Sequence, residues 1–145
     1  MRPLGIGAAL LIAACSPPQE PPSPVAAQVP AEPIDQVATL DGHWRVAGMD
    51  GAEVQGQYAI ALTGDERAIW WEPRCAGQSV DYTIDGTSFS ATDPNGPDQI
   101  VCDIGFPEEL DQLWSAMLAA DTIERTPENG ISISGNGRSV LLFSQ

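Results

Sequence analysis

The dipeptide Asp85-Gly86 lies between two runs of strand-forming residues, Ser79–Ile84 and Thr87–Ala91. Asp-Gly is strongly favoured at the tip of a two-residue β-hairpin, because both central positions of that turn need a positive φ. Similar turn chemistry occurs at Gly64-Asp65 and at Gly135–Gly137. We therefore predict short strands joined by tight hairpins, which restricts the chain to a mainly antiparallel sheet.

One segment departs from this pattern and has helical periodicity. Pro107 suits the first helical position, and Glu108 and Glu109 fall in the first turn, where the helix dipole favours acidic groups. The apolar residues that follow have i, i+3, i+4, i+7, i+8 spacing and predict one buried face: Leu110, Leu113, Trp114, Met117 and Leu118. The expected fold class is α+β, a curved and mainly antiparallel sheet of about 7–8 short strands with one amphipathic helix packed on it.

The first residues have the composition of an export signal. One basic residue, Arg2, precedes an apolar run from Pro3 to Ala14, and small residues lead directly to Cys15. The run is shorter than the roughly 20 residues that a membrane-spanning helix needs. This stretch resembles a bacterial lipobox, which implies cleavage before Cys15 and acylation of its thiol. A plain signal peptide with an incidental cysteine is the alternative.

These features divide the chain into three parts. Residues 1–14 are expected to be a lipoprotein signal peptide. Residues 15–34 are expected to be the lipidated cysteine and a proline-rich tether that leans toward polyproline II. Residues 35–145 are expected to form a single globular domain. Ser16 after the lipidated cysteine favours the outer membrane by analogy with lipoprotein sorting, with the domain facing the periplasm.

The two remaining cysteines, Cys75 and Cys102, predict one disulfide, because an even pair in an exported protein is usually bonded. A redox pair would normally have Cys-x-x-Cys spacing, and a zinc site would need two more ligands in a chain whose only histidine is His43. A short strand over Ile100–Ile104 is expected to carry Cys102 toward the helix.

The net charge of −14 and the absence of lysine disfavour nucleic-acid binding, which needs clustered basic residues. The same charge favours solubility and cationic partners. The expected state is a monomer that requires no cofactor and reaches the membrane only through its N-terminal lipid.

No catalytic or metal site is predicted. A triad would have to use His43, which lies at the start of the first expected strand as an ordinary surface residue would. Acidic and amide side chains crowd the loop before the helix and would suit Ca²⁺, although their spacing differs from an EF-hand and such residues simply favour turns: Asp93, Asn95, Asp98 and Asp103.

A possible binding surface is predicted at Trp70, Trp71 and Arg74. The two tryptophans are adjacent on an expected strand, Ala68–Glu72, and therefore point to opposite faces of the sheet. Core packing is the default for both. An exposed indole beside Arg74 would instead stack on a sugar or anchor a protein partner.

Several segments together resemble the META domain, the HslJ-like group of small bacterial envelope lipoproteins. They are Arg74-Cys75-Ala76-Gly77 after a Trp-bearing strand, Tyr82–Gly86, Val101-Cys102, the helix, and Gly130–Ser134. The likeness spans Trp44–Phe143, although this chain lacks the Gly-Cys-Asn and Thr-x-Met-Ala sequences typical of that family. The resemblance implies a non-catalytic, structural, stress-related or binding role in the envelope. The alternative is a lipoprotein inhibitor of a secreted or periplasmic hydrolase, a lysozyme or a protease, although such inhibitors lack a central long helix.

Overall fold

A computed structural model describes residues 36–54, 59–94 and 102–145. The predictions for the signal peptide, Cys15 and the tether lie outside these residues. Nine strands, one α-helix and one 3₁₀ turn occur in the described part: β1 (Gly42–Met49), β2 (Ala52–Glu53), β3 (Ala61–Gly64), β4 (Ala68–Trp71), η1 (Arg74–Ala76), β5 (Ser79–Asp85), β6 (Ser88–Thr92), α1 (Glu109–Ala119), β7 (Thr122–Arg125), β8 (Ile131–Gly135) and β9 (Arg138–Ser144).

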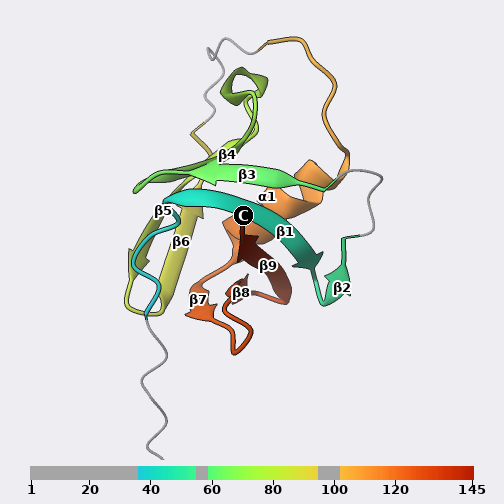
Figure 1. The fold of residues 1–145 in the computed structure, drawn as a ribbon. Helices are drawn as coiled ribbons and strands as arrows, with labels where there is room; N and C mark the ends of the chain where they lie inside the picture. The colour runs from blue at the N-terminus through green and yellow to red at the C-terminus, as the bar shows by residue number, and fades with distance from the viewer. Residues whose placement is uncertain (1–35, 55–58, 95–101) are drawn as a thin grey trace, which may run out of the picture. The chain divides into compact units, whose positions relative to one another are not determined.

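The predicted antiparallel sheet with one helix is confirmed, and the sheet is closed. β1 pairs with β3, each strand from β3 to β8 pairs with the next one along the chain, and β9 returns to pair with β1. Eight strands therefore form an antiparallel barrel. The short β2 lies outside it and pairs antiparallel with the end of β1 (Figure 1). A register shift between Val46 and Gly48 interrupts the pairing of β1 with β9. Such an irregularity bends a strand and increases its twist, which suits closure of a barrel.

Alternating side chains fill the barrel. In β5, Val80 and Tyr82 point inward and are buried, whereas Asp81 and Thr83 are exposed. Tyr82 stacks on Phe89 of β6 with the ring centroids 6.2 Å apart. All buried side chains in the described part are apolar or aromatic. The interior is therefore a packed core of the kind expected for a small barrel.

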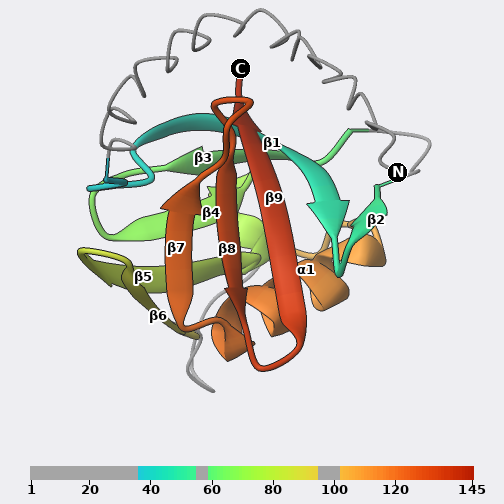
Figure 2. The same cartoon turned by 90° about the horizontal axis from the view of Figure 1, so that it is seen from below.

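α1 covers one end of the barrel. In Figure 2 it lies beside the lower ends of β8 and β9. Leu110, Leu113 and Met117 are fully buried under it, as the periodicity predicts, and Ala116 joins them. The prediction for Leu118 is wrong, because this side chain is 41% exposed. A helix lying across a barrel end buries a narrow stripe, and Leu118 falls beside that stripe.

Residues 36–41, which we call the strap, cover the other end of the barrel. Val37 and Leu40 are buried there. The hydroxyl of Tyr82 accepts the Leu40 N–H at 2.7 Å and donates to the Asp65 carbonyl at 2.6 Å. Trp44 Nε1 donates to the Leu40 carbonyl at 2.8 Å. The strap is therefore part of the folded domain and closes the end opposite α1.

The strand predicted over Ile100–Ile104 is not formed in its described part. Residues 102–104 are irregular and pair with no strand. The Cys102 N–H is instead donated to the Cys75 carbonyl at 2.6 Å, and the Ile104 N–H returns to the Cys102 carbonyl at 3.0 Å. The carbonyl of Cys75, the disulfide partner, therefore accepts the hydrogen bond that a neighbouring strand would otherwise accept from Cys102.

Candidate functional site

Trp70 and Trp71 point to opposite sides of β4. Trp71 pairs across the sheet with Leu62, which is buried in the barrel, so Trp71 lies on the inner side and packs half-buried against the core. Trp70 pairs with Thr63 and Ser79 and therefore lies on the outer side. The structure separates these two members of the predicted binding surface.

Trp70 lies on the outside of the barrel and yet is only 9% exposed. Its Nε1 donates to Glu72 Oε1 at 2.6 Å, and the guanidinium carbon of Arg74 lies 4.3 Å from the ring centroid. The second carboxylate oxygen of Glu72 accepts the Arg74 N–H at 3.2 Å. Trp70 and Arg74 are therefore brought together, with Arg74 stacked on the indole as a cation on a π face.

The Cys75–Cys102 disulfide is confirmed, with the two Cα atoms 5.3 Å apart. It joins η1, which follows β4, to the segment that leads into α1. Since the N–H of Cys102 also binds the carbonyl of Cys75, the two segments are held by one covalent and one hydrogen bond.

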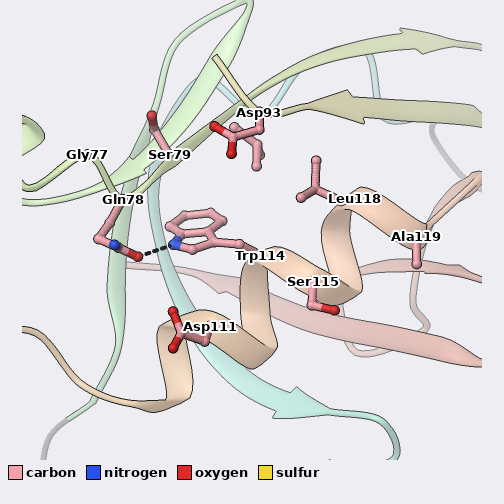
Figure 3. A pocket seen from close by; sticks show the side chains of 10 residues that line it. Gly77, Gln78, Ser79, Asp93, Asp111, Trp114, Ser115, Leu118 and Ala119 are labelled. Atoms are coloured by element: carbon pink, nitrogen blue, oxygen red, sulfur yellow. Dashed lines mark hydrogen bonds between the residues drawn. The ribbon is translucent and has the colours of Figure 1, made fainter. Parts of the chain in front are cut away.

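A groove of about 550 Å³ runs between α1 and the adjoining ends of β5 and β6. We call it the α1 groove, and Figure 3 shows most of the side chains that line it. The lining residues are Gly77, Gln78, Ser79, Val80, Asp93, Asp111, Trp114, Ser115, Leu118 and Ala119. This volume lies within the range of ordinary ligand pockets, about 300–1,000 Å³.

Trp114 is fixed in the α1 groove by a hydrogen bond. Its Nε1 donates to Gln78 Oε1 at 2.8 Å (Figure 3), and the side chain is 8% exposed. The Gln78 carbonyl in turn accepts the Trp71 N–H at 2.9 Å. The indole is thus held by the side chain of Gln78, whose own backbone is bonded to β4, so the groove is shaped before any ligand arrives.

Two carboxylates are among the side chains that line the α1 groove. Asp111 and Asp93 are both exposed, and in the view of Figure 3 the Trp114 indole lies between them. None of the groove's lining residues is basic. The nearest arginine contact that the structure gives is at Ser115, whose Oγ accepts Arg138 Nη1 at 3.1 Å.

The side chain of Arg138 binds groups from two other parts of the fold, the turn after β1 and α1. Its Nε lies 3.0 Å from both carboxylate oxygens of Asp50, and Nη2 donates to the Gln112 carbonyl at 3.2 Å. Hydrogen bonds from the Arg138 side chain and then from the Ser139 N–H hold the pKa of Asp50 below its usual range. This contact connects the turn after β1, the start of β9 and α1.

Of the remaining sequence candidates that the structure describes, Asp93 lines the α1 groove, whereas His43 and Asp103 are not among its lining residues. His43 is exposed on β1, with Nδ1 3.3 Å from Thr63 Oγ1. Asp93 and Asp103 are exposed, whereas Asn95 and Asp98 lie outside the described residues. Within the described ranges, no three His, Cys, Asp or Glu side chains are grouped as metal ligands would be.

The sequence reading placed Trp114 in the core and missed the α1 groove. One signal was present, because Asp111, Trp114, Ser115 and Leu118 have i, i+3, i+4, i+7 spacing and share a helix face beside the buried stripe. Gln78 carries no such signal, since its contact with Trp114 spans 36 positions.

Comparison with protein-family models, with curated proteins and with solved structures found no match for this chain. In the part of the chain described above, no helix has the length and apolar character needed to cross a membrane.

Proposed function

We propose that this chain is a non-catalytic, lipid-anchored envelope protein that presents its barrel to a partner. Cys15 and the proline-rich residues after it support the anchor and the tether. One observation about the domain carries the binding role. The barrel is filled by its own side chains and covered at both ends, by α1 and by the strap.

A filled barrel cannot enclose a ligand as wider barrels do. Ligand pockets combine apolar walls with a few converging polar groups. In the described residues that combination occurs on the outside, where Asp111, Trp114 and Gln78 line the α1 groove. Binding at the outer surface is therefore the function that this geometry supports best.

A META-like role in the envelope agrees with one helix packed on antiparallel strands and with the Cys75–Cys102 bond. Inhibition of a secreted or periplasmic hydrolase is the second candidate. Closure of eight strands into a barrel favours it, as does a net charge of −14 opposite a basic enzyme such as lysozyme. The presence of α1 counts against this candidate, because such inhibitors lack a central long helix.

Photo-crosslinking in intact envelopes tests the binding role. The lipidated chain is expected to give a discrete adduct that a Cys15→Ser chain, which is not held at the membrane, forms more weakly. If neither chain forms an adduct, the binding role is wrong. Lysozyme and serine protease assays with the purified chain separate the two candidates, because only the inhibitor predicts a loss of hydrolase activity at micromolar protein.

A further inference from the structure

We propose that Asn136 is a site of spontaneous deamidation, at which the folded chain converts its own side chain with water as the co-reactant. All three asparagines of the chain, Asn95, Asn129 and Asn136, precede a glycine. Asn-Gly is the sequence most prone to this reaction, because glycine has no side chain to obstruct attack by its own backbone nitrogen. Asn95 lies outside the described residues, so the structure compares the other two pairs.

The reaction exchanges the side-chain amide for an acid. The backbone nitrogen of the glycine attacks Cγ of the asparagine and closes a succinimide ring. The bond from Cγ to Nδ2 breaks, and the glycine N–H proton leaves with the amide nitrogen as ammonia. Water then opens the ring at either carbonyl and leaves aspartate or isoaspartate. Ring closure requires the peptide plane between the two residues to rotate until the nitrogen faces Cγ.

The Asn136-Gly137 pair has room for this rotation. Both residues are exposed at the turn between β8 and β9, where Gly135 pairs with Arg138. A Cβ built on Gly137 would meet no atom within 4 Å, so there is open space beside this peptide plane. The glycine nitrogen can therefore approach Cγ of Asn136 while the rest of the barrel stays folded.

The Asn129-Gly130 pair is held in place by packing and hydrogen bonds. Gly130 is buried, and a Cβ built on it would lie 3.0 Å from both the Leu142 carbonyl oxygen and Phe143 Cε1. The Gly130 N–H donates to Thr126 Oγ1 at 3.1 Å, and its carbonyl accepts the Thr126 N–H at 2.9 Å. Rotation of this peptide plane requires local unfolding, although the Asn129 side chain itself is exposed.

Deamidation of Asn136 alters a contact with α1. Its Nδ2 donates to the carbonyl of Ala119, the last residue of the helix, at 2.8 Å. A carboxylate has no N–H to donate and adds negative charge at the helix end that already carries partial negative charge. Asn129 has the opposite role, because its Oδ1 accepts Arg125 Nη1 at 2.9 Å and an aspartate keeps that acceptor. The reaction at Asn136 therefore weakens the attachment of the end of α1 to the β8–β9 turn.

Peptide mass spectrometry tests the site. Both asparagines lie on one tryptic peptide, residues 126–138, because Arg125 and Arg138 bound it. The full chain, held in detergent micelles, is aged in mildly alkaline buffer made with ¹⁸O water and then digested in ordinary water. Electron-transfer fragmentation separates acid formed at the two positions and distinguishes isoaspartate from aspartate. Because Gly130 reacts only after local opening, acid at Asn136 is expected to exceed acid at Asn129 by at least about tenfold.

The same chain unfolded in urea is the control. Neither pair keeps its folded surroundings there, so the two rates are expected to agree within about twofold. Equal acid at both positions in the folded chain overturns the proposal. So does an unmodified Asn136 in the folded chain over a time in which the unfolded chain reacts.

Two variants test the consequence for α1. Asn136→Asp keeps a sequence that suits this turn, since Asp-Gly is also favoured there, and replaces the donor to Ala119 with a carboxylate. Its melting temperature is expected to fall by roughly 2–6 °C, with faster amide exchange in the last turn of α1. Asn129→Asp makes the same substitution beside Arg125 and is expected to change neither quantity. Equal losses in the two variants would overturn the role assigned to the Asn136 amide at the end of α1.

Discussion

The hydroxyl oxygen of Tyr82 takes part in hydrogen bonds with three other residues. Its hydroxyl lies 3.0 Å from Thr39 Oγ1, accepts the buried Leu40 N–H and donates to the Asp65 carbonyl. Tyr82→Phe leaves the Leu40 N–H without that acceptor in a buried position. Because an unsatisfied buried donor is costly, we expect urea denaturation to show a loss of about 1–3 kcal/mol in the free energy of unfolding.

Thr83→Val is the control for that change. Thr83 is the next residue of β5, and its Oγ1 makes an exposed 2.7 Å contact with Ser90 Oγ. Valine keeps the β-branched shape, so the expected change is within about 0.5 kcal/mol. Equal effects of the two substitutions would show that the strap is not held through the Tyr82 hydroxyl.

At the scale of the element, α1 offers two leucines with opposite surroundings. Leu113 is fully buried against the barrel, whereas Leu118 is 41% exposed beside the α1 groove. Leu113→Ala is expected to cost about 2–5 kcal/mol, because it leaves a cavity in a packed core. Leu118→Ala removes the same atoms from the same helix and is expected to cost less than about 0.5 kcal/mol. Thermal unfolding of both variants measures the contrast, and similar losses would mean that α1 buries a different face.

The contact between Asp50 and Arg138 makes the attachment of α1 depend on pH. Hydrogen bonds in the folded state hold the pKa of Asp50 below its usual range, so its contribution is complete above the unfolded pKa of about 3.9 and is lost as pH falls through the lower folded value. Asp50→Asn keeps the side-chain shape, and asparagine tolerates the positive φ of 51° at this position. We expect its melting temperature to be lower than that of the unchanged chain at pH 6, and the gap to narrow below about pH 4. A gap that is constant with pH would exclude the carboxylate charge as its cause.

Local elements were predictable because their causes are local. The β5–β6 hairpin and the apolar period of α1 are both properties of a few neighbouring residues, and both are present in the fold. The predicted position of the turn is one residue early, because Asp85 pairs with Ser88 and the turn residues are Gly86 and Thr87. Closure of the barrel was not predictable, since β1 and β9 lie at opposite ends of the domain sequence and no residue announces their pairing. The α1 groove was missed for the same reason, because it depends on where the helix lies on the barrel.

At the scale of the whole molecule, the junction between β6 and β7 is the thinnest part of the barrel. Only Ser88 and Thr122 are paired there, since α1 is inserted between the two strands. The Cys75–Cys102 bond ties the chain before α1 back to η1 and spans 27 positions that include β5 and β6. We infer that the disulfide compensates for this thin junction by limiting how far α1 and β6 separate.

The double variant Cys75→Ala/Cys102→Ala tests that inference without leaving a free thiol in the domain. Its expected cost is about 3.5 kcal/mol in the chain-entropy model. If the disulfide supports the β6–β7 junction, amide exchange should accelerate most in α1 and at Phe89 and Ile123, whose N–H groups bond across that junction. Amides shared by β8 and β9, which five residue pairs join, should change least. Uniform acceleration would instead show that the bond acts only on the unfolded chain.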